Sequence, residues 1–170
     1  MVPSAALETL DTFALSQRLG QACLARRLCV TAAESCTGGG VASAITAVAG
    51  SSEYFETGYV TYANAAKMRL LGVPVEILDA HGAVSRETVE AMVAGACVES
   101  GADLGVAISG VAGPGGGSAE KPVGTVWLAW GDTTHQRAER YRFDGDRLAI
   151  REKAVRVALE GLIRWLEDHN

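Results

Sequence analysis

The sequence lacks the features that mark several large classes of protein. Basic residues are outnumbered, with 15 Lys and Arg against 20 Asp and Glu and a formal net charge of −5 at pH 7. This balance disfavours sequence-independent binding to nucleic acids or anionic membranes, because both need clustered positive charge. No apolar run approaches the roughly 18 residues that a membrane-spanning helix requires. We therefore expect no direct nucleic-acid partner and no membrane partner.

Cysteine and histidine are also few and poorly spaced for metal or disulfide chemistry. None of the 4 cysteines belongs to a C-x-x-C motif, and none of the 3 histidines lies at metal-ligand spacing from another. The N-terminal region has no basic-then-apolar secretion signal. Reduced thiols in a cytoplasm fit this pattern best. We expect a soluble, cytoplasmic protein with no metal and no other cofactor.

Glycine, by contrast, is abundant. It accounts for 20 of the 170 residues, or about 12% against an average usage of about 7%. Glycine costs conformational entropy on folding, so its clusters at 38–40 and 113–117 need a structural or functional reason. Of the whole sequence, 48% is hydrophobic and 21% is charged, a composition typical of a packed globular protein. The length suits a single domain over residues 1–170.

Hydrophobic periodicity and capping residues predict alternating helices and strands. Strands are predicted over 28–33, 57–62, 104–108 and 125–130, with a charged edge strand over 136–143. Helices are predicted from an N-cap at Ser4 to residue 27, over 41–49, over 64–71, over 85–100 from an N-cap at Ser85, and over 147–168 after an N-cap at Asp146. This order of elements predicts an α/β protein, a three-layer α/β/α sandwich with a mixed sheet.

Two loops are candidates for a ligand site. Ligands of open α/β sheets bind at the carboxyl ends of strands, and the loops there are 34–40 and 109–118. The first places Ser35 and the following backbone N–H groups at a helix N-terminus, which favours either a phosphate or an oxyanion. The alternative is that Thr37 merely caps this helix while the glycines allow close packing against the strand. The residues alone leave both interpretations open.

Several known motifs do not match, which leaves lysine as the base for Ser35. The sequence contains no G-x-x-x-x-G-K-[ST], no G-x-G-x-x-G and no G-x-S-x-G. A Ser-His-Asp triad would have to recruit His81 from an expected loop. A neutral lysine amine can accept the serine proton if burial lowers its pKa, and Lys67, in an alanine-rich segment, is the leading candidate. The alternative is a solvated lysine on a short surface helix.

Six segments occur in an order that is far more specific than either glycine cluster. They read AESCTGG at 33–39, AGSS at 49–52, VTYANAAK at 60–67, HGAVS at 81–85, ISGVAGP at 108–114 and KPVGTV at 121–126. Together they resemble the CinA C-terminal domain family, which includes nicotinamide-mononucleotide amidohydrolases. The resemblance runs from about residue 28 to residue 151. The chain resembles the stand-alone form of the family, which is without the N-terminal domain that many relatives carry.

The resemblance implies hydrolysis of the carboxamide of nicotinamide mononucleotide to nicotinic acid mononucleotide and ammonia, without a metal. It implies Ser35 as nucleophile, Lys67 as its base and Tyr62 as a third catalytic residue that holds the lysine or relays a proton. We expect an acyl-serine intermediate whose oxyanion is received by backbone N–H groups of the first loop. The second glycine loop, Lys121 and Arg147 would bind the phosphate. The predicted substrate-binding residues are Thr37, Gly38, Gly39, Ser109, Gly110, Gly113, Gly115, Gly116, Gly117 and Arg147.

Other interpretations remain compatible with these residues. Cys36 adjoins Ser35 and, with His81 as base, would form a cysteine amidase. The chain could instead be a non-catalytic module that senses pyridine nucleotides or binds a partner, linked to competence or the DNA-damage response. Apart from the family, Arg147 reads equally well as a first-turn surface residue. A homodimer is expected only from the base rates of soluble proteins.

Overall fold

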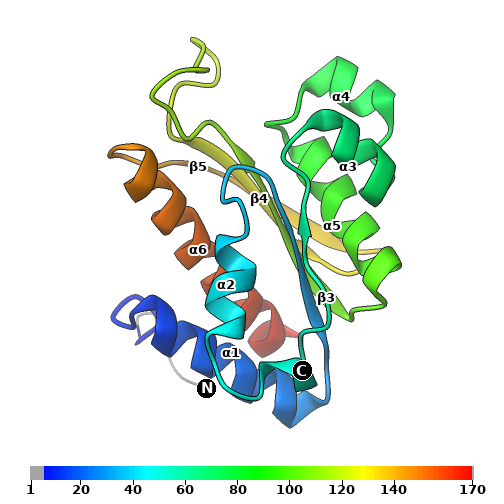
Figure 1. The fold of residues 1–170 in the computed structure, drawn as a ribbon, viewed down its shortest axis with the longest axis vertical. Coiled ribbons are helices and arrows are strands. Elements are labelled where there is room, and N and C mark those ends of the chain that lie inside the picture. Colours follow the sequence, from blue (N-terminus) through cyan, green and yellow to red (C-terminus); the bar gives the residue numbers. More distant parts are fainter. Residues whose placement is uncertain (1–5, 170) are drawn as a thin grey trace.

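Five strands form one mixed sheet in the order β2-β1-β3-β4-β5 (Figure 1). The structure, a computed structural model, describes residues 6–169. β1 pairs in parallel with β2 and β3, whereas β4 pairs antiparallel with β3 and β5. The strands are β1 Val30–Glu34, β2 Tyr59–Val60, β3 Leu104–Gly110, β4 Thr125–Gly131 and β5 Gln136–Arg142.

Helices cover both faces of the sheet, which confirms the predicted three-layer sandwich. α1, α2 and α6 lie on one face, and α3, α4 and α5 lie on the other (Figure 1). Within the described part of the chain, no helix is long and apolar enough to span a membrane. The helices are α1 Thr12–Arg26, α2 Gly40–Thr46, α3 Asn64–Leu71, α4 Val75–His81, α5 Arg86–Ser100 and α6 Arg147–Asp168, with a short 3₁₀ helix, η2, at Ser51–Glu53.

The two central strands are buried on both faces, as a sheet between two helical layers requires. Every residue of β1 is buried, and so are the first six residues of β3. Alternate side chains reach separate cores. Ala32, Val106 and Ile108 pack with α1 and α6, whereas Ala33 and Ala107 pack with α5. Small residues on the α5 side let that helix lie close to the sheet.

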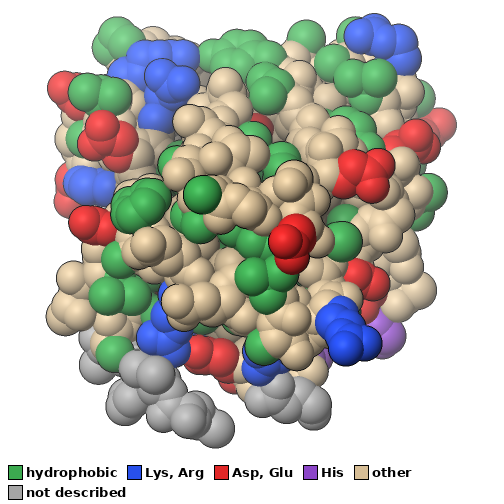
Figure 2. Space-filling view, turned by 60° about the horizontal axis from the view of Figure 1, so that its bottom comes forward, with side chains coloured by type: hydrophobic (Ala, Val, Ile, Leu, Met, Phe, Trp, Pro, Cys, Tyr) green, Lys and Arg blue, Asp and Glu red, His purple; other side chains and the backbone are tan. Residues whose placement is uncertain are grey.

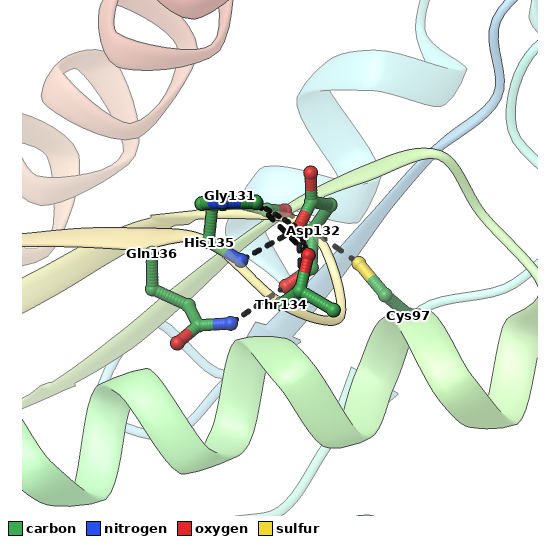
Figure 3. A network of polar contacts seen from close by, with 6 residues as sticks. All are labelled: Cys97, Gly131, Asp132, Thr134, His135 and Gln136. Carbon is green, nitrogen blue, oxygen red and sulfur yellow. Dashed lines mark hydrogen bonds and ion pairs between the residues drawn. The ribbon is translucent and has the colours of Figure 1, made fainter.

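The turn between β4 and β5 is organised by one carboxylate (Figure 3). The Asp132 Oδ1 atom accepts hydrogen bonds from the backbone N–H groups of Thr134 at 2.8 Å and His135 at 2.7 Å. Gln136 donates to the Asp132 carbonyl at 2.9 Å, and the Cys97 thiol of α5 contacts the Gly131 carbonyl at 3.6 Å. This turn lies at the opposite end of the sheet from the carboxyl ends of β1 and β3.

On the face shown in Figure 2, basic and acidic side chains are interspersed around hydrophobic side chains that lie in small groups. This mixture agrees with the near balance of 15 basic and 20 acidic residues in the sequence. No continuous positive band crosses this face in the described part of the chain. This face of the described residues therefore shows no basic surface of the kind that binds a polyanion.

Most element predictions are confirmed, and the differences have local causes. The N-caps Ser85 and Asp146 are confirmed by hydrogen bonds from Thr88 N and Ala149 N. The predicted cap Ser4 lies outside the described residues, and α1 begins after Asp11, whose side chain accepts from Ala14 N.

Other predictions differ from the structure in the limits or the type of an element. The strand predicted over 57–62 is limited to Tyr59–Val60: before it the Thr57 carbonyl accepts the Thr31 hydroxyl, and after it the carbonyls of Thr61 and Tyr62 accept from Lys67. The helix predicted over 41–49 ends at Thr46. The loop expected around His81 is wrong, since residues 75–81 form α4.

Candidate active site

Ser35 lies in a tight turn at the carboxyl end of β1. Its N–H donates to the Ile108 carbonyl of β3 at 3.0 Å, and its carbonyl accepts from Gly38 N–H at 3.1 Å. Gly38 and Gly39 have φ angles of +59° and +103°, a region that L side chains rarely adopt. These glycines reverse the chain within a few residues and lead it into α2. The turn therefore fixes the Ser35 hydroxyl at the edge of the sheet where strands give way to helices.

Lys67 brings its amine directly to this hydroxyl. The Lys67 Nζ atom lies 3.0 Å from Ser35 Oγ, 2.9 Å from the Thr61 carbonyl and 3.0 Å from the Tyr62 carbonyl. The lysine belongs to the short helix α3, but its side chain points inward and is only 1% exposed. Burial lowers the pKa of Lys67, and a smaller effect of Cys36 opposes this shift. The solvated-lysine interpretation is therefore wrong.

A cavity of about 290 Å³ opens onto this pair. Among the described residues that line it, Lys67 and Arg147 are basic and none is acidic, so the cavity suits an anionic ligand. In the described part of the chain, no group of three or more His, Cys, Asp or Glu residues is placed to hold a metal ion. The lining residues are Ser35, Cys36, Tyr62, Asn64, Lys67, Ala83, Val84, Ser109, Gly110, Val111, Ala112, Gly113, Gly115, Gly116 and Arg147.

Arg147 connects two walls of the cavity. From the first turn of α6 it donates to the Tyr62 hydroxyl at 2.9 Å and to the Gly113 carbonyl at 2.8 Å. The Tyr62 side chain is 59% exposed, so its ring forms part of the rim. The resemblance implies that Tyr62 holds the lysine or relays a proton. In the structure its main-chain carbonyl accepts from Lys67, and its hydroxyl accepts from Arg147.

The predicted binding residues divide into two groups. Ser109, Gly110, Gly113, Gly115, Gly116 and Arg147 line the cavity together with Ser35, Lys67 and Tyr62. Four others do not line it: Thr37, Gly38, Gly39 and Gly117. The Lys121 amine lies elsewhere, donating to the His81 carbonyl at 2.8 Å. The structure thus brings together Ser35, Lys67 and the second glycine loop, but not the glycines that follow Ser35.

The expected open helix N-terminus is wrong because Glu34 occupies it. The Glu34 carboxylate is 1% exposed and accepts from Val41 N–H at 2.8 Å and Ala42 N–H at 3.1 Å. The Thr37 hydroxyl donates to the same carboxylate at 2.7 Å, so Thr37 is not itself the helix cap. An acidic side chain at this position satisfies the free donors of α2 and matches its dipole. These N–H groups are therefore not available to a phosphate.

Sequence reasoning missed several residues of this region. Glu34 was read only as part of a polar turn, since a cap usually lies next to its helix and Glu34 precedes Val41 by seven positions. Ala83 and Val84 line the cavity because α4 and α5 bring their connection to it. Their segment was one of the six that carried the family resemblance, which is the signal that could have found them.

The cysteine alternative does not fit the geometry. Burial is the main cause that raises the pKa of the Cys36 thiol to about 11, which disfavours a thiolate nucleophile. The proposed partner His81 does not line the cavity, and its ring lies 3.6 Å from Glu87. Cys36 is therefore a buried neighbour of Ser35 rather than an activated thiol.

Comparison with known proteins identifies a family that covers most of the chain. Residues 12–166 match the CinA C-terminal domain family, a range that includes every lining residue. A nicotinamide-nucleotide amidohydrolase PncC of Pseudomonas putida is 59% identical over 150 residues, which cover 88% of this chain and 94% of that protein.

Two further relatives agree with this match. The protein of the same name from Escherichia coli K12 is 52% identical over 149 residues, covering 87% of this chain and 90% of that one. The crystal structure of the competence damage-inducible protein A of Klebsiella pneumoniae aligns with a TM-score of 0.92 at 40% identity, covering 95% of this chain and all of that one.

Proposed function

Because the chain belongs to the CinA C-terminal domain family, we propose that it hydrolyses the carboxamide of nicotinamide mononucleotide to nicotinic acid mononucleotide and ammonia. This activity makes it an amidohydrolase acting on a linear amide. The two relatives at 59% and 52% identity that carry this activity in their names support the reaction. The observation that carries the mechanism is the 3.0 Å separation of Lys67 Nζ and Ser35 Oγ at the wall of the cavity.

The first half of the reaction forms an acyl-serine. Neutral Lys67 accepts the proton of Ser35 as Oγ attacks the carboxamide carbon. The positive pyridinium ring of the substrate withdraws electrons from this carbon and eases the attack. The tetrahedral intermediate then collapses, the C–N bond breaks, and the Lys67 ammonium returns its proton to the leaving amine, which departs as ammonia.

The second half releases the acid. A water molecule loses a proton to Lys67 and attacks the ester carbonyl of acyl-Ser35. The bond to Ser35 Oγ breaks, and Oγ takes the proton back from Lys67. The nicotinic acid mononucleotide leaves with its carboxyl group, and the pair returns to its starting state.

Substrate recognition comes from the basic and glycine-rich wall. Arg147 offers a guanidinium at the rim, and at Gly113, Gly115 and Gly116 the backbone lines the cavity without side chains. A guanidinium and backbone N–H groups suit a phosphate group. The Ser109 hydroxyl lies in the same wall and is placed to donate to a polar group of the substrate.

Substitution of the two reacting residues tests this function. We expect Ser35→Ala and Lys67→Met each to lower ammonia release from nicotinamide mononucleotide by at least about 10³-fold, because each removes a group that reacts. Lys153→Met on α6 is the matched control, since Lys153 is exposed and donates to the Asp144 carbonyl away from the cavity. Near wild-type release by either test variant would remove the proposed pair. Tight binding of the nucleotide to the wild type without ammonia release would favour the non-catalytic module.

A further inference from the structure

The turn that carries Ser35 is held by a side chain from a distant part of the chain. Arg151, on the second turn of α6, donates from Nε to the Cys36 carbonyl at 3.1 Å and from Nη2 to the Thr37 carbonyl at 3.3 Å. These carbonyls follow Ser35 directly and precede α2. A guanidinium is a planar fork, so two such bonds fix both the position and the orientation of the peptide groups they reach.

Two glycines of the first cluster are explained by this contact. A Cβ atom at Gly38 would lie 3.1 Å from Arg151 Nη2, at a φ of +59°. A Cβ atom at Gly40 would lie 2.8 Å from Val155 Cγ2, one turn further along α6. The glycines therefore allow α6 to lie against the turn, and neither residue lines the active-site cavity. This close packing is what brings the guanidinium within reach.

The same turn is held from its other side by Glu34. The buried Glu34 carboxylate binds the Thr37 hydroxyl and the first N–H groups of α2. Arg151 binds the carbonyls of Cys36 and Thr37, so the turn is fixed between an acidic and a basic side chain. Arg151 lies beside a separate groove of about 530 Å³ between α1, α2 and α6, which contains neither Ser35 nor Lys67.

We infer that Arg151 is a positioning residue for the reaction, which keeps Ser35 Oγ in line with the Lys67 amine and the bound amide. This inference rests on the proposed function. Reacting atoms must be held to within about 0.5 Å, and a shift of about 1 Å can lower a rate by roughly 10²-fold. Arg151 does not itself line the cavity, and it contacts none of the groups proposed to bind the phosphate, so its loss affects the chemical step and not substrate binding.

The two arginines of early α6 therefore have different tasks. Arg147 lines the cavity and bonds to Tyr62 and Gly113, whereas Arg151, one turn later, bonds to the turn behind the nucleophile. Loss of Arg147 is expected to raise KM, because it removes a cation from the cavity. Loss of Arg151 is expected to lower kcat with KM nearly unchanged.

The test compares Arg151→Met and Arg151→Lys with the control Arg156→Met. Arg156 lies on the same helix and also donates to main-chain carbonyls, those of Leu7, Glu8 and Leu10, and it pairs with Glu160, but it does not line the cavity. We expect Arg151→Met to lower kcat about 10- to 100-fold with KM within about threefold of wild type. Arg151→Lys keeps the positive charge and one donor nitrogen but loses the planar fork, and it should recover part of this loss. Arg156→Met should leave kcat within about twofold.

Hydrogen exchange of the peptide covering residues 35–40 supplies a readout that does not depend on the substrate. Arg151→Met should speed exchange in this peptide at least about fivefold, and Arg156→Met should not. Unchanged exchange together with unchanged kcat in Arg151→Met would overturn the inference. The inference would also be overturned if the fall in kcat of Arg151→Met were no larger than the fall in the fraction of folded protein. If the wild type releases no ammonia, the proposed function fails, and the exchange measurement still decides whether Arg151 fixes the turn.

Discussion

At the scale of single residues, the proposed mechanism requires a particular arrangement of hydrogen bonds around Lys67. A neutral amine has two N–H donors and one lone pair. The carbonyls of Thr61 and Tyr62, at 2.9 and 3.0 Å from Nζ, are the acceptors for the two donors. In the proposed mechanism the lone pair then faces Ser35 Oγ at 3.0 Å, and the serine proton turns toward it from the Tyr62 carbonyl, which lies 3.4 Å from Oγ. In this mechanism the two carbonyls orient the amine as well as satisfying its donors.

The rate should depend on pH through this amine. Burial lowers the pKa of Lys67 from 10.5, and only its neutral form can act as base. We therefore expect kcat/KM to rise as pH increases through the lowered pKa of Lys67 and then to level off. The measurement is ammonia release between about pH 6 and 10 at constant ionic strength. A profile that is flat, or that falls toward alkaline pH, would contradict a neutral lysine base.

Cys36 provides a second test at this scale. Burial raises its pKa to about 11, so little thiolate exists at neutral pH and alkylation by iodoacetamide should be slow. We expect Cys36→Ala to retain activity within about threefold of wild type, because the substitution leaves the Ser35–Lys67 pair in place. The assay is ammonia release before and after iodoacetamide treatment. Inactivation of the wild type but not of Cys36→Ala would revive the cysteine mechanism.

At the scale of secondary structure, the sequence predicts elements better than it predicts their ends. The caps Ser85 and Asp146 could be read because each lies next to its helix and acts three residues ahead. The helix α4 was missed because its seven residues show too few turns for a periodic pattern. β2 could not be delimited, since the carbonyls on either side of it bind side chains rather than a neighbouring strand: Thr57 accepts from Thr31, and Thr61 accepts from Lys67.

The candidate site shows the same division between local and distant information. Ser35 and Lys67 could be selected from residue type and family resemblance, and the structure places them 3.0 Å apart. The role of Glu34 could not be predicted, because a carboxylate that caps from the end of a strand depends on the path of the following turn. Arg151 could not be predicted for a similar reason, since its two carbonyl acceptors lie more than 100 residues earlier.

The β4–β5 turn allows a stability prediction that involves only one element. Burial would raise the pKa of Asp132, but hydrogen bonds from His135 and Thr134 lower it below its ordinary value (Figure 3). A carboxyl group whose pKa is lower in the folded than in the unfolded protein stabilises the folded state at pH values above the unfolded-state pKa. This contribution is lost as the pH falls through the folded-state pKa.

We expect Asp132→Asn to lower the free energy of unfolding at pH 7 by about 0.5 kcal/mol, a small value because the side chain is partly exposed and screened. The difference from wild type should shrink below about pH 4. Urea unfolding at several pH values measures it. Asp79→Asn, on an exposed position of α4, is the control and should show no such trend. An Asp132→Asn difference that grows as pH falls would contradict the assignment.

At the scale of the whole molecule, the cavity is assembled from five segments that are far apart in the sequence. They are 35–36, 62–67, 83–84, 109–116 and Arg147, and they meet beyond the carboxyl ends of β1 and β3. α6 joins the site to the opposite end of the sheet (Figure 1). With 22 residues it has a length of about 33 Å. A substitution near the C-terminal end of α6 can therefore change the stability of the protein without changing the geometry of the site at the first turns of the helix.

Gly161 offers a direct test of this separation. The Trp130 indole packs on α6 and donates to the Ala158 carbonyl at 3.0 Å. A Cβ atom at Gly161 would lie 2.1 Å from Trp130 Cε2. In an exposed helix, Gly→Ala usually stabilises by about 1 kcal/mol. Here the clash with a large ring buried in the core should reverse the sign, so that Gly161→Ala lowers the free energy of unfolding by about 2 kcal/mol.

Gly161 and Arg147 lie about 21 Å apart along the helix axis. The kcat of the folded Gly161→Ala variant should therefore stay within about twofold of wild type, whereas its urea midpoint falls. Leu148→Ala, at a position 62% exposed near the start of the same helix, is the control for stability and should change it by less than about 0.5 kcal/mol. A rise in the stability of Gly161→Ala would mean that Trp130 can move aside. The close packing of α6 on the sheet would then not be what fixes the helix in place.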